Sequence, residues 1–128
     1  MERTKRVLVI EDNENNIYLI TFILKKNGYD SMEARDGAAG VEMALKEKPD
    51  LILMDMQLPV LDGYEATKRI KAMEETRGIP VIAITSFAMV GDKEKALGVG
   101  CDGYIEKPIN PVTIMTELKK YLDENENK

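Results

Sequence analysis

Acidic residues that could bind a metal ion or act as nucleophiles stand directly after two apolar segments. Glu11 and Asp12 follow the run Val7–Ile10, and Asp55 follows the run Leu51–Met54. Two carboxylates about 5 Å apart repel by roughly 3 kcal/mol at an effective dielectric constant near 20. Three converging acids therefore need a cation, and magnesium, a hard ion with oxygen ligands, suits a site with few carboxylates. A carboxylate can also attack phosphorus, so Asp55 is a candidate nucleophile that would form an aspartyl phosphate.

Polar residues also follow two other strand-like segments. Thr85 comes directly after Val81–Ile84, and Lys107 with Pro108 comes shortly after Gly103–Ile105. Lys107 would supply one positive charge, and a divalent ion could bridge the carboxylates to a phosphoryl oxygen. Each of these residues alone would be read as an ordinary turn, cap or surface residue. Their shared placement after separate segments indicates a common site.

Five short segments alternate with helical patterns along the chain. The expected strands are Val7–Ile10, Ser31–Ala34, Leu51–Met54, Val81–Ile84 and Gly103–Ile105. The expected helices run from Asn13 or Glu14 to Lys26, after a cap at Asp36, after a cap at Asp62, over Val90–Val99, and from the N-cap and first-turn pair Asn110–Pro111. This alternation predicts an α/β fold, a five-stranded parallel sheet flanked by five helices in three layers. The common winding has strand order 2-1-3-4-5, with its crevice at the carboxyl ends of strands one and three.

Apolar spacing predicts which face of each helix is buried. In the first helix, Ile17, Ile20 and Leu24 are expected to face the core, which leaves Leu19 and Ile23 partly outward. The corresponding core stripes are Ala38, Val41 and Leu45 in the second helix, Ala66, Ile70 and Met73 in the third, and Ile114, Leu118 and Leu122 in the last. An exposed apolar pair beside a reactive site is typical of a docking patch.

Composition limits the class of protein. The 128 residues, 44% of them apolar, suit one globular domain with its core at about residues 5–122 and a polar tail at 123–128. The net charge of −5 argues against nucleic-acid binding, and no apolar run is long enough to cross a membrane. A single cysteine and no export signal favour the cytoplasm. The lack of histidine excludes Ser-His and Cys-His catalysis and disfavours a zinc enzyme.

Four sequence motifs coincide with the ends of the expected strands. They are Val-Leu-Val-Ile-Glu-Asp-Asn at 7–13, the block Asp50–Pro59 with Asp62-Gly63, the pair Thr85-Ser86, and the pair Lys107-Pro108. Together they resemble a bacterial two-component response-regulator receiver domain, whose fold is CheY-like or flavodoxin-like. The start Asp12-Asn13-x-x-Asn16 and the segment Phe87–Met89 also resemble the single-domain DivK type and the receivers of hybrid kinases.

The resemblance implies a role for each matching residue. Asp55 matches the phosphoacceptor, Asp12 and the main-chain carbonyl of Gln57 match ligands of Mg²⁺ or Mn²⁺, Glu11 matches their acidic neighbour, Thr85 and Lys107 match the groups that bind the phosphoryl, and Tyr104 matches the switch aromatic. The Lys107–Pro108 peptide is expected to be cis. Since no position departs from the family's pattern, the chain is expected to be a working receiver.

The implied function is a phosphorylation-dependent signalling switch rather than an enzyme with a separate substrate. The phosphoryl donor would be a histidine of a sensor kinase or of a phosphotransfer protein, because the chain has none of its own. No output domain is expected after Leu122, so the signal would pass to a downstream protein target. The first helix is expected to meet the kinase, and the fourth helix, fifth strand and fifth helix are expected to carry the output.

Two other functions are compatible with this fold or with a nucleophilic aspartate. A flavodoxin-like cofactor-binding protein needs a first loop rich in Gly, Ser or Thr, whereas the loop Glu11–Asn16 would repel a phosphate unless a metal intervened. A haloacid-dehalogenase-like phosphohydrolase would also use Asp55 as its nucleophile, but needs a second acid two residues later. Gln57 stands at that position. A coloured protein would support the first alternative, and turnover of a generic phosphate ester would support the second.

Overall fold

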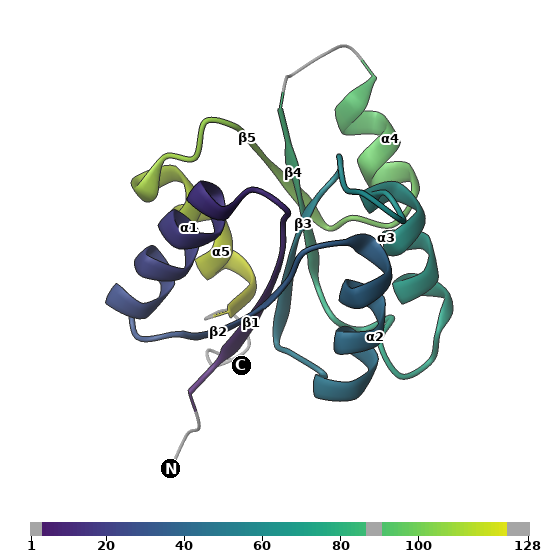
Figure 1. Ribbon diagram of the computed structural model, residues 1–128, viewed down its shortest axis with the longest axis horizontal. Coiled ribbons are helices and arrows are strands. Elements are labelled where there is room, and N and C mark those ends of the chain that lie inside the picture. Colours follow the sequence, from purple (N-terminus) through teal and green to yellow (C-terminus); the bar gives the residue numbers. More distant parts are fainter. Residues whose placement is uncertain (1–3, 87–90, 123–128) are drawn as a thin grey trace.

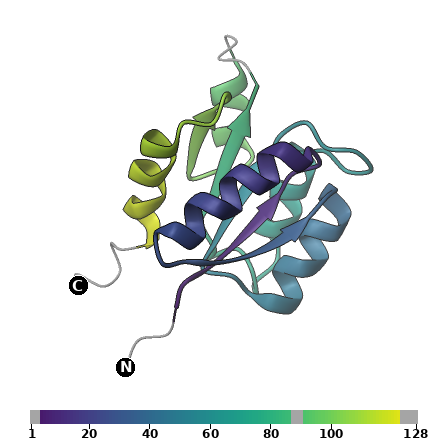
Figure 2. The same cartoon turned by 60° about the vertical axis from the view of Figure 1, so that its left-hand side comes forward.

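The computed structural model describes residues 4–86 and 91–122, in which five strands and five helices alternate (Figure 1 and Figure 2). The strands are β1 (Arg6–Ile10), β2 (Asp30–Ala34), β3 (Leu51–Asp55), β4 (Val81–Thr85) and β5 (Gly103–Glu106). The helices are α1 (Glu14–Lys26), α2 (Gly37–Glu47), α3 (Gly63–Ala72), α4 (Asp92–Gly98) and α5 (Pro111–Leu122). All strand pairs are parallel and their order is β2-β1-β3-β4-β5, which confirms the predicted fold. The motif Phe87–Met89 and the tail 123–128 lie outside the described residues.

Helices cover both faces of the sheet. Helices α1 and α5 lie on one face, and α2, α3 and α4 lie on the other (Figure 1). Along β1, Val7 and Val9 point into the core beneath α1 and α5, whereas Leu8 and Ile10 point into the core beneath α2 and α3. Strands buried on both faces need apolar residues at every position. This requirement explains the continuous apolar runs of β1, β3 and β4.

Side-chain caps begin four of the helices. Asn13, Asp36 and Asp62 each accept a hydrogen bond from the N–H three residues further on, at the starts of α1, α2 and α3. Asn110 accepts from two N–H groups in the first turn of α5. These contacts satisfy helix donors that have no partner within the helix. Asp36, Asp62 and Asn110 are the caps predicted from the sequence, and together with Asn13 they fix where these helices start.

The buried face of α2 differs from the predicted one. Ala38 and Leu45 are exposed, and the buried positions include Gly37 and Gly40. A Cβ added at position 40 would lie 2.5 Å from Cδ1 of Ile10, so glycine allows the helix to approach β1 closely. The prediction failed because it assigned the core face to larger apolar side chains, whereas close packing requires small ones.

The buried face of α1 is wider than predicted. The three residues of the predicted stripe are buried, but Ile23 is buried as well, at 6% exposed, so its outward placement was wrong. Ile23 packs in the same cluster as residues of α5, because α1 contacts both the sheet and that helix. Leu19 is partly buried, as predicted. Phe22, at 53% exposed, is a large outward apolar side chain that the spacing missed.

Helix α4 is shorter than the predicted Val90–Val99. It has seven residues, and its N-cap, Gly91, has a φ of 100° and makes no side-chain capping bond. Ala96 is its only buried residue. Met73, predicted to continue the core stripe of α3, is instead the residue that ends that helix. Because α4 buries little and lacks a cap, it is the least anchored of the five described helices.

Candidate metal and nucleophile site

The carboxyl ends of four strands bring the predicted site residues to one edge of the sheet. Glu11 directly follows β1, Asp55 ends β3, Thr85 ends β4, and Lys107 follows β5. Parallel strands point the same way, so these ends meet on one side, toward the top of Figure 1. The register of the sheet therefore gathers residues that are far apart in the sequence.

Three carboxylates and one ammonium form the centre of the site. Glu11 is fully buried, Asp55 is 2% exposed and Asp12 is exposed. One oxygen from each of the three lies within 4.8 Å of the others. The Nζ of Lys107 lies 3.0 Å from Oδ2 of Asp55 and 3.6 Å from Oε1 of Glu11. One lysine cannot balance three carboxylates, and this oxygen-rich donor set fits a hard divalent cation such as magnesium.

The electrostatics reflect this excess of acid. Burial, followed by the hydrogen bond and negative charge of Asp55, raises the pKa of Glu11 to about 7. Burial alone would lower the pKa of Lys107, but its hydrogen bond to Asp55 and its attraction to the charges of Asp55 and Glu11 outweigh burial and raise that pKa. Lys107 therefore stays charged, and the carboxyl group of Glu11 can hold a proton near neutral pH when no metal balances its charge.

Backbone contacts orient the two buried carboxylates. The N–H of Gln57 donates to Oδ1 of Asp55 at 2.9 Å, and the N–H of Asn13 donates to Oε2 of Glu11 at 3.2 Å. Gly63 begins α3 directly against this segment, where a Cβ would lie 2.3 Å from the carbonyl oxygen of Asp55. The pair Asp62-Gly63 thus supplies both a helix cap and the space that the β3–α3 loop needs.

Two buried oxygens at the site make no hydrogen bond with any described residue. They are Oγ1 of Thr85, in a residue 4% exposed, and Oε1 of Glu11. Buried polar atoms are nearly always paired, so oxygens left open here are available to a ligand. The N–H of Lys107 donates to the carbonyl of Thr85 at 2.7 Å, and the Lys107–Pro108 peptide is cis, as the resemblance implied.

Tyr104 and Ser86 lie outside the acidic cluster. Tyr104 is half-buried on β5, opposite Ala83, and Lys93 of α4 lies over its ring at 5.1 Å from the centroid. These contacts place it on the α4 side of the sheet rather than among the acids. Sequence reasoning assigned no role to Ser86, whose hydroxyl donates to Oε1 of Gln57 at 3.2 Å. The position of Ser86, directly after Thr85 at a strand end, is the sequence feature that could have identified it as a site residue.

The sequence of the chain matches the family model of the response regulator receiver domain over residues 7–119. The chain belongs to this family. As a receiver domain it is a phosphorylation-dependent signalling switch, and neither the phosphohydrolase nor the flavodoxin-like alternative is favoured. Among the described residues of this receiver, every helix is too short or too polar to cross a membrane.

Curated relatives of this receiver include response regulators of nearly the same length. The polar-differentiation response regulator DivK of Brucella ovis is 45% identical over 119 residues, which are 93% of this chain and 97% of that protein. DivK of Brucella anthropi is 44% identical over 118 residues, 92% of this chain and 96% of that protein. The likeness to DivK-type receivers thus extends over nearly the full length of both chains.

Solved receiver structures have the same fold. The receiver domain of the sensor histidine kinase PA1611 of Pseudomonas aeruginosa, solved with a magnesium ion in its active site cleft, has a TM-score of 0.88 at 37% identity. The match covers 94% of this chain and 99% of that one. The chemotaxis response regulator CheY4 of Vibrio cholerae has a TM-score of 0.88 at 26% identity, over 93% and 99% of the two chains. This receiver is therefore CheY-like in fold.

Proposed function

We propose that Asp55 accepts a phosphoryl group from a phosphohistidine of another protein, with a divalent ion bound beside it. The observation that carries this proposal is the placement of its carboxylate. Asp55 is 2% exposed, its Oδ1 accepts from a backbone N–H, its Oδ2 contacts Lys107, and oxygens of Glu11 and Asp12 lie within 4.8 Å. A carboxylate held this way is oriented for attack and surrounded by the charges that phosphoryl transfer requires.

The residues of the site divide the work of this transfer. Asp12, Asp55 and the main-chain carbonyl of Gln57 would hold Mg²⁺ or Mn²⁺, with Glu11 assisting from its buried position. The ion offsets negative charge on the phosphoryl oxygens. An oxygen of Asp55 forms the new bond to phosphorus as the bond from phosphorus to the histidine nitrogen breaks. Lys107 and the open Oγ1 of Thr85 then bind phosphoryl oxygens.

The proposed phosphoryl donor is a histidine on a sensor kinase or on a histidine phosphotransfer protein. The phosphorylated domain would then pass the signal to a downstream protein. Two of the solved relatives are receiver domains of histidine kinases, which supports a partner of this class. We propose no turnover of a separate substrate and no binding of nucleic acid or membrane. A cytoplasmic location and a single-domain organisation, with its core at about residues 5–122, remain predictions from the sequence.

We propose that the kinase contacts the apolar surface between α1 and α5. A hollow of about 440 Å³ lies there, and its lining includes Leu19, Phe22, Val112 and Met115. Phe22 and Val112 are 53% and 76% exposed. Changing Leu19 and Phe22 to Ser should slow phosphorylation by a phosphohistidine protein about tenfold but leave phosphorylation by acetyl phosphate unchanged, because the small donor needs no docking surface. Equal slowing with both donors would contradict the docking role.

Intact-mass measurement tests the proposed acceptor. Incubation with acetyl phosphate and magnesium should add the mass of one phosphoryl group to the wild-type protein. A chelator should prevent the gain, because the carboxylates would then lack their balancing charge. Asp55→Asn should gain no phosphoryl group, whereas Asp62→Asn, which alters a helix cap outside the acidic cluster, should still gain one. Phosphorylation of Asp55→Asn at the wild-type rate would exclude Asp55 as the acceptor.

A further inference from the structure

Strand β2 forms an open edge of the sheet, since within residues 4–86 and 91–122 it pairs only with β1. Asp30 donates its N–H to the carbonyl of Lys5 at one end, and the carbonyl of Ala34 accepts from the N–H of Glu11, directly after β1, at the other. In a parallel pair, alternate residues bond to the neighbouring strand. Ser31 and Glu33 therefore direct their N–H and C=O groups outward. Such a row of free groups is a template for another strand.

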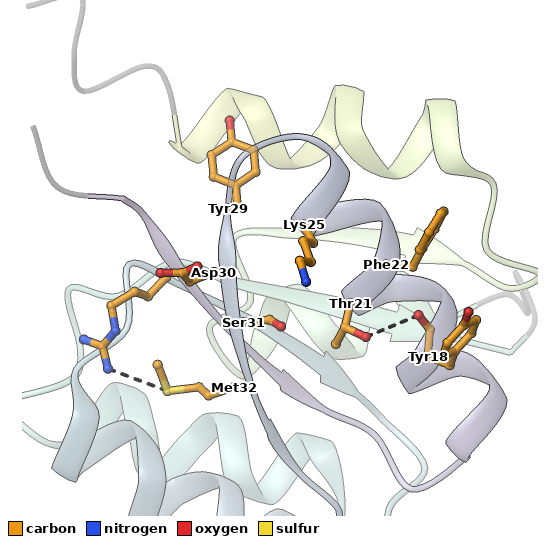
Figure 3. Close-up of a pocket in the computed structure, with 9 residues that line it drawn as sticks. Tyr18, Thr21, Phe22, Lys25, Tyr29, Asp30, Ser31 and Met32 are labelled. Atoms are coloured by element: carbon orange, nitrogen blue, oxygen red, sulfur yellow. Dashed lines mark hydrogen bonds between the residues drawn. The ribbon is translucent and has the colours of Figure 1, made fainter.

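A hollow of about 630 Å³ lies beside this edge (Figure 3). It is lined by Tyr18, Thr21, Phe22 and Lys25 of α1, by Tyr29, Asp30, Ser31 and Met32 in and before β2, and by Arg6. Tyr18 and Phe22 are 73% and 53% exposed and their rings stack with centroids 6.3 Å apart. Exposed apolar side chains next to the open edge of a strand are typical of a surface that another chain covers.

The residues of β2 are complementary to a second copy of the same strand. If two β2 strands lie antiparallel about a twofold axis at Met32, Ser31 of one protomer stands opposite Glu33 of the other. These are the residues with outward N–H and C=O groups, so the two strands can exchange hydrogen bonds at both pairs. Asp30 then stands opposite Ala34. In this register no acidic residue of β2 faces another acidic residue.

The charges around the hollow favour the same register. Ser31 and Glu33 pair with Val7 and Val9, so all four side chains lie on the α1 face of the sheet. Lys25 extends from α1 toward Ser31 (Figure 3). A glutamate placed opposite Ser31 by the second copy would therefore enter the hollow near this ammonium. The twofold axis repeats the contact. Within its own protomer Glu33 uses Oε1 to bind Arg35 at 3.2 Å, and Oε2 can take the second cation.

We propose that this receiver forms a symmetric dimer through the edges of its β2 strands, with Lys25 and Glu33 paired reciprocally across the interface. The interface is isologous and joins the two five-stranded sheets into one. It is small, so the association is weak and reversible. In the antiparallel arrangement the two Asp55 sites lie toward opposite ends of the joined sheet, and both remain accessible to a phosphoryl donor.

Sedimentation equilibrium of the full chain tests the dimer, at concentrations from about 10 µM to about 1 mM because a small interface binds weakly. The wild-type protein should show a concentration-dependent monomer–dimer equilibrium. Lys25→Glu and Glu33→Lys should each weaken dimerisation about tenfold, because both reciprocal pairs become repulsive. The double variant should recover dimerisation to within about threefold of the wild type, because it restores both pairs with their charges exchanged.

Matched variants separate this effect from a change in net charge or folding. Arg77→Glu and Glu75→Lys make the corresponding charge changes at exposed positions after α3, and should leave the equilibrium unchanged. Ser31→Pro removes one outward N–H while leaving the bonds to β1 in place, and should abolish dimerisation. Phosphorylation by acetyl phosphate reports that each variant is folded. A wild-type protein that stays monomeric throughout, or a dimer insensitive to Ser31→Pro or unrescued in the double charge variant, would overturn the proposal.

Discussion

At the scale of single residues, the site holds two buried carboxyl groups, Glu11 and Asp55, that share one cation, Lys107. Lys107 lies within 3.6 Å of both Glu11 and Asp55, and burial makes ionisation of Glu11 costly. The pKa of Glu11 rises to about 7 as a result. A proton and a metal ion are therefore alternative ways to relieve the same repulsion. Metal affinity should increase as the pH rises through about 7, since ligand carboxylates bind as anions.

The pKa of Glu11 predicts how the stability of the metal-free protein depends on pH. Its value of about 7 in the folded protein exceeds the ordinary 4.5, so the folded state binds the proton more tightly than the unfolded state. The resulting stabilisation is fully present below pH 4.5 and is lost as the pH rises through about 7. At about 1.4 kcal/mol per pKa unit, a rise from 4.5 to about 7 makes the loss at most about 3.5 kcal/mol.

Urea unfolding in the presence of a chelator measures this effect. The free energy of unfolding of the wild-type protein, relative to that of Glu11→Gln, should fall between pH 4.5 and about 8, because the amide does not titrate. Magnesium should reduce the loss at high pH by offsetting the charge of Glu11. Identical pH dependence in the two proteins would show that Glu11 does not carry the shifted proton.

At the scale of elements, the packing of α2 depends on glycine. A Cβ at Gly37 would lie 1.8 Å from the carbonyl oxygen of Leu61, a backbone atom that cannot move alone. Gly37→Ala should therefore destabilise the protein by about 2 kcal/mol or more, despite the better helix propensity of alanine. Gly98→Ala is the matched helical control, because no atom lies within 4 Å of its added Cβ. It should be neutral or stabilising by up to about 1 kcal/mol in denaturant unfolding.

Equal stabilities of the two glycine variants would contradict this account of α2.

Helix α2 also shows which part of the fold could not be predicted from the sequence. Apolar periodicity identified the buried stripes of α1 and α5, because large side chains fill those interfaces. It chose Ala38 and Leu45 as core residues of α2, because a hydrophobicity pattern cannot tell that two surfaces approach too closely for a side chain. The exposed Phe22 was missed for a related reason, since one apolar stripe does not show how many neighbours a helix has.

The candidate site was more predictable than the helix packing. Its residues end or follow buried strands, and the order of a parallel sheet fixes where strand ends meet. Residue type then limits the chemistry to that of carboxylates, a hydroxyl and an ammonium. The contact of Ser86 with the Gln57 side chain and the open Oγ1 of Thr85 depend on rotamers and loop paths. A sequence pattern carries little information about either.

At the scale of the whole molecule, the arrangement predicts where phosphorylation changes the surface. Thr85 lies at the end of β4, and its open Oγ1 can move toward a phosphoryl oxygen on Asp55. Helix α4, the least anchored described helix, follows β4, and its Lys93 lies over the ring of Tyr104 on β5. Each tenfold shift between two conformations of this region requires a free-energy difference of about 1.4 kcal/mol. Because α4 is weakly anchored, a difference of this size is enough to move it.

Beryllofluoride with magnesium, as a mimic of the phosphorylated state, should shift the backbone amide resonances mainly between Thr85 and Ile105. Residues of α2 and α3 should shift less, because α2 packs on α3, β1 and β2, and α3 packs on β3, whereas α4 packs on β5. Titration of Asp55→Asn under the same conditions is the control for binding away from the site. Perturbations that cluster on α2 and α3 would place the output on another face.

Mapping the phosphorylated residue tests the central claim most directly. The protein is phosphorylated with acetyl phosphate and magnesium, the acyl phosphate is reduced with borohydride, and the peptides are sequenced by mass spectrometry. Reduction converts a phosphorylated aspartate to homoserine and leaves free carboxylates unchanged. The geometry of the carboxylate beside Lys107 predicts homoserine at position 55. Homoserine at position 12 or 62 instead, or no homoserine after a confirmed gain of mass, would contradict the assignment of Asp55 as the phosphoacceptor.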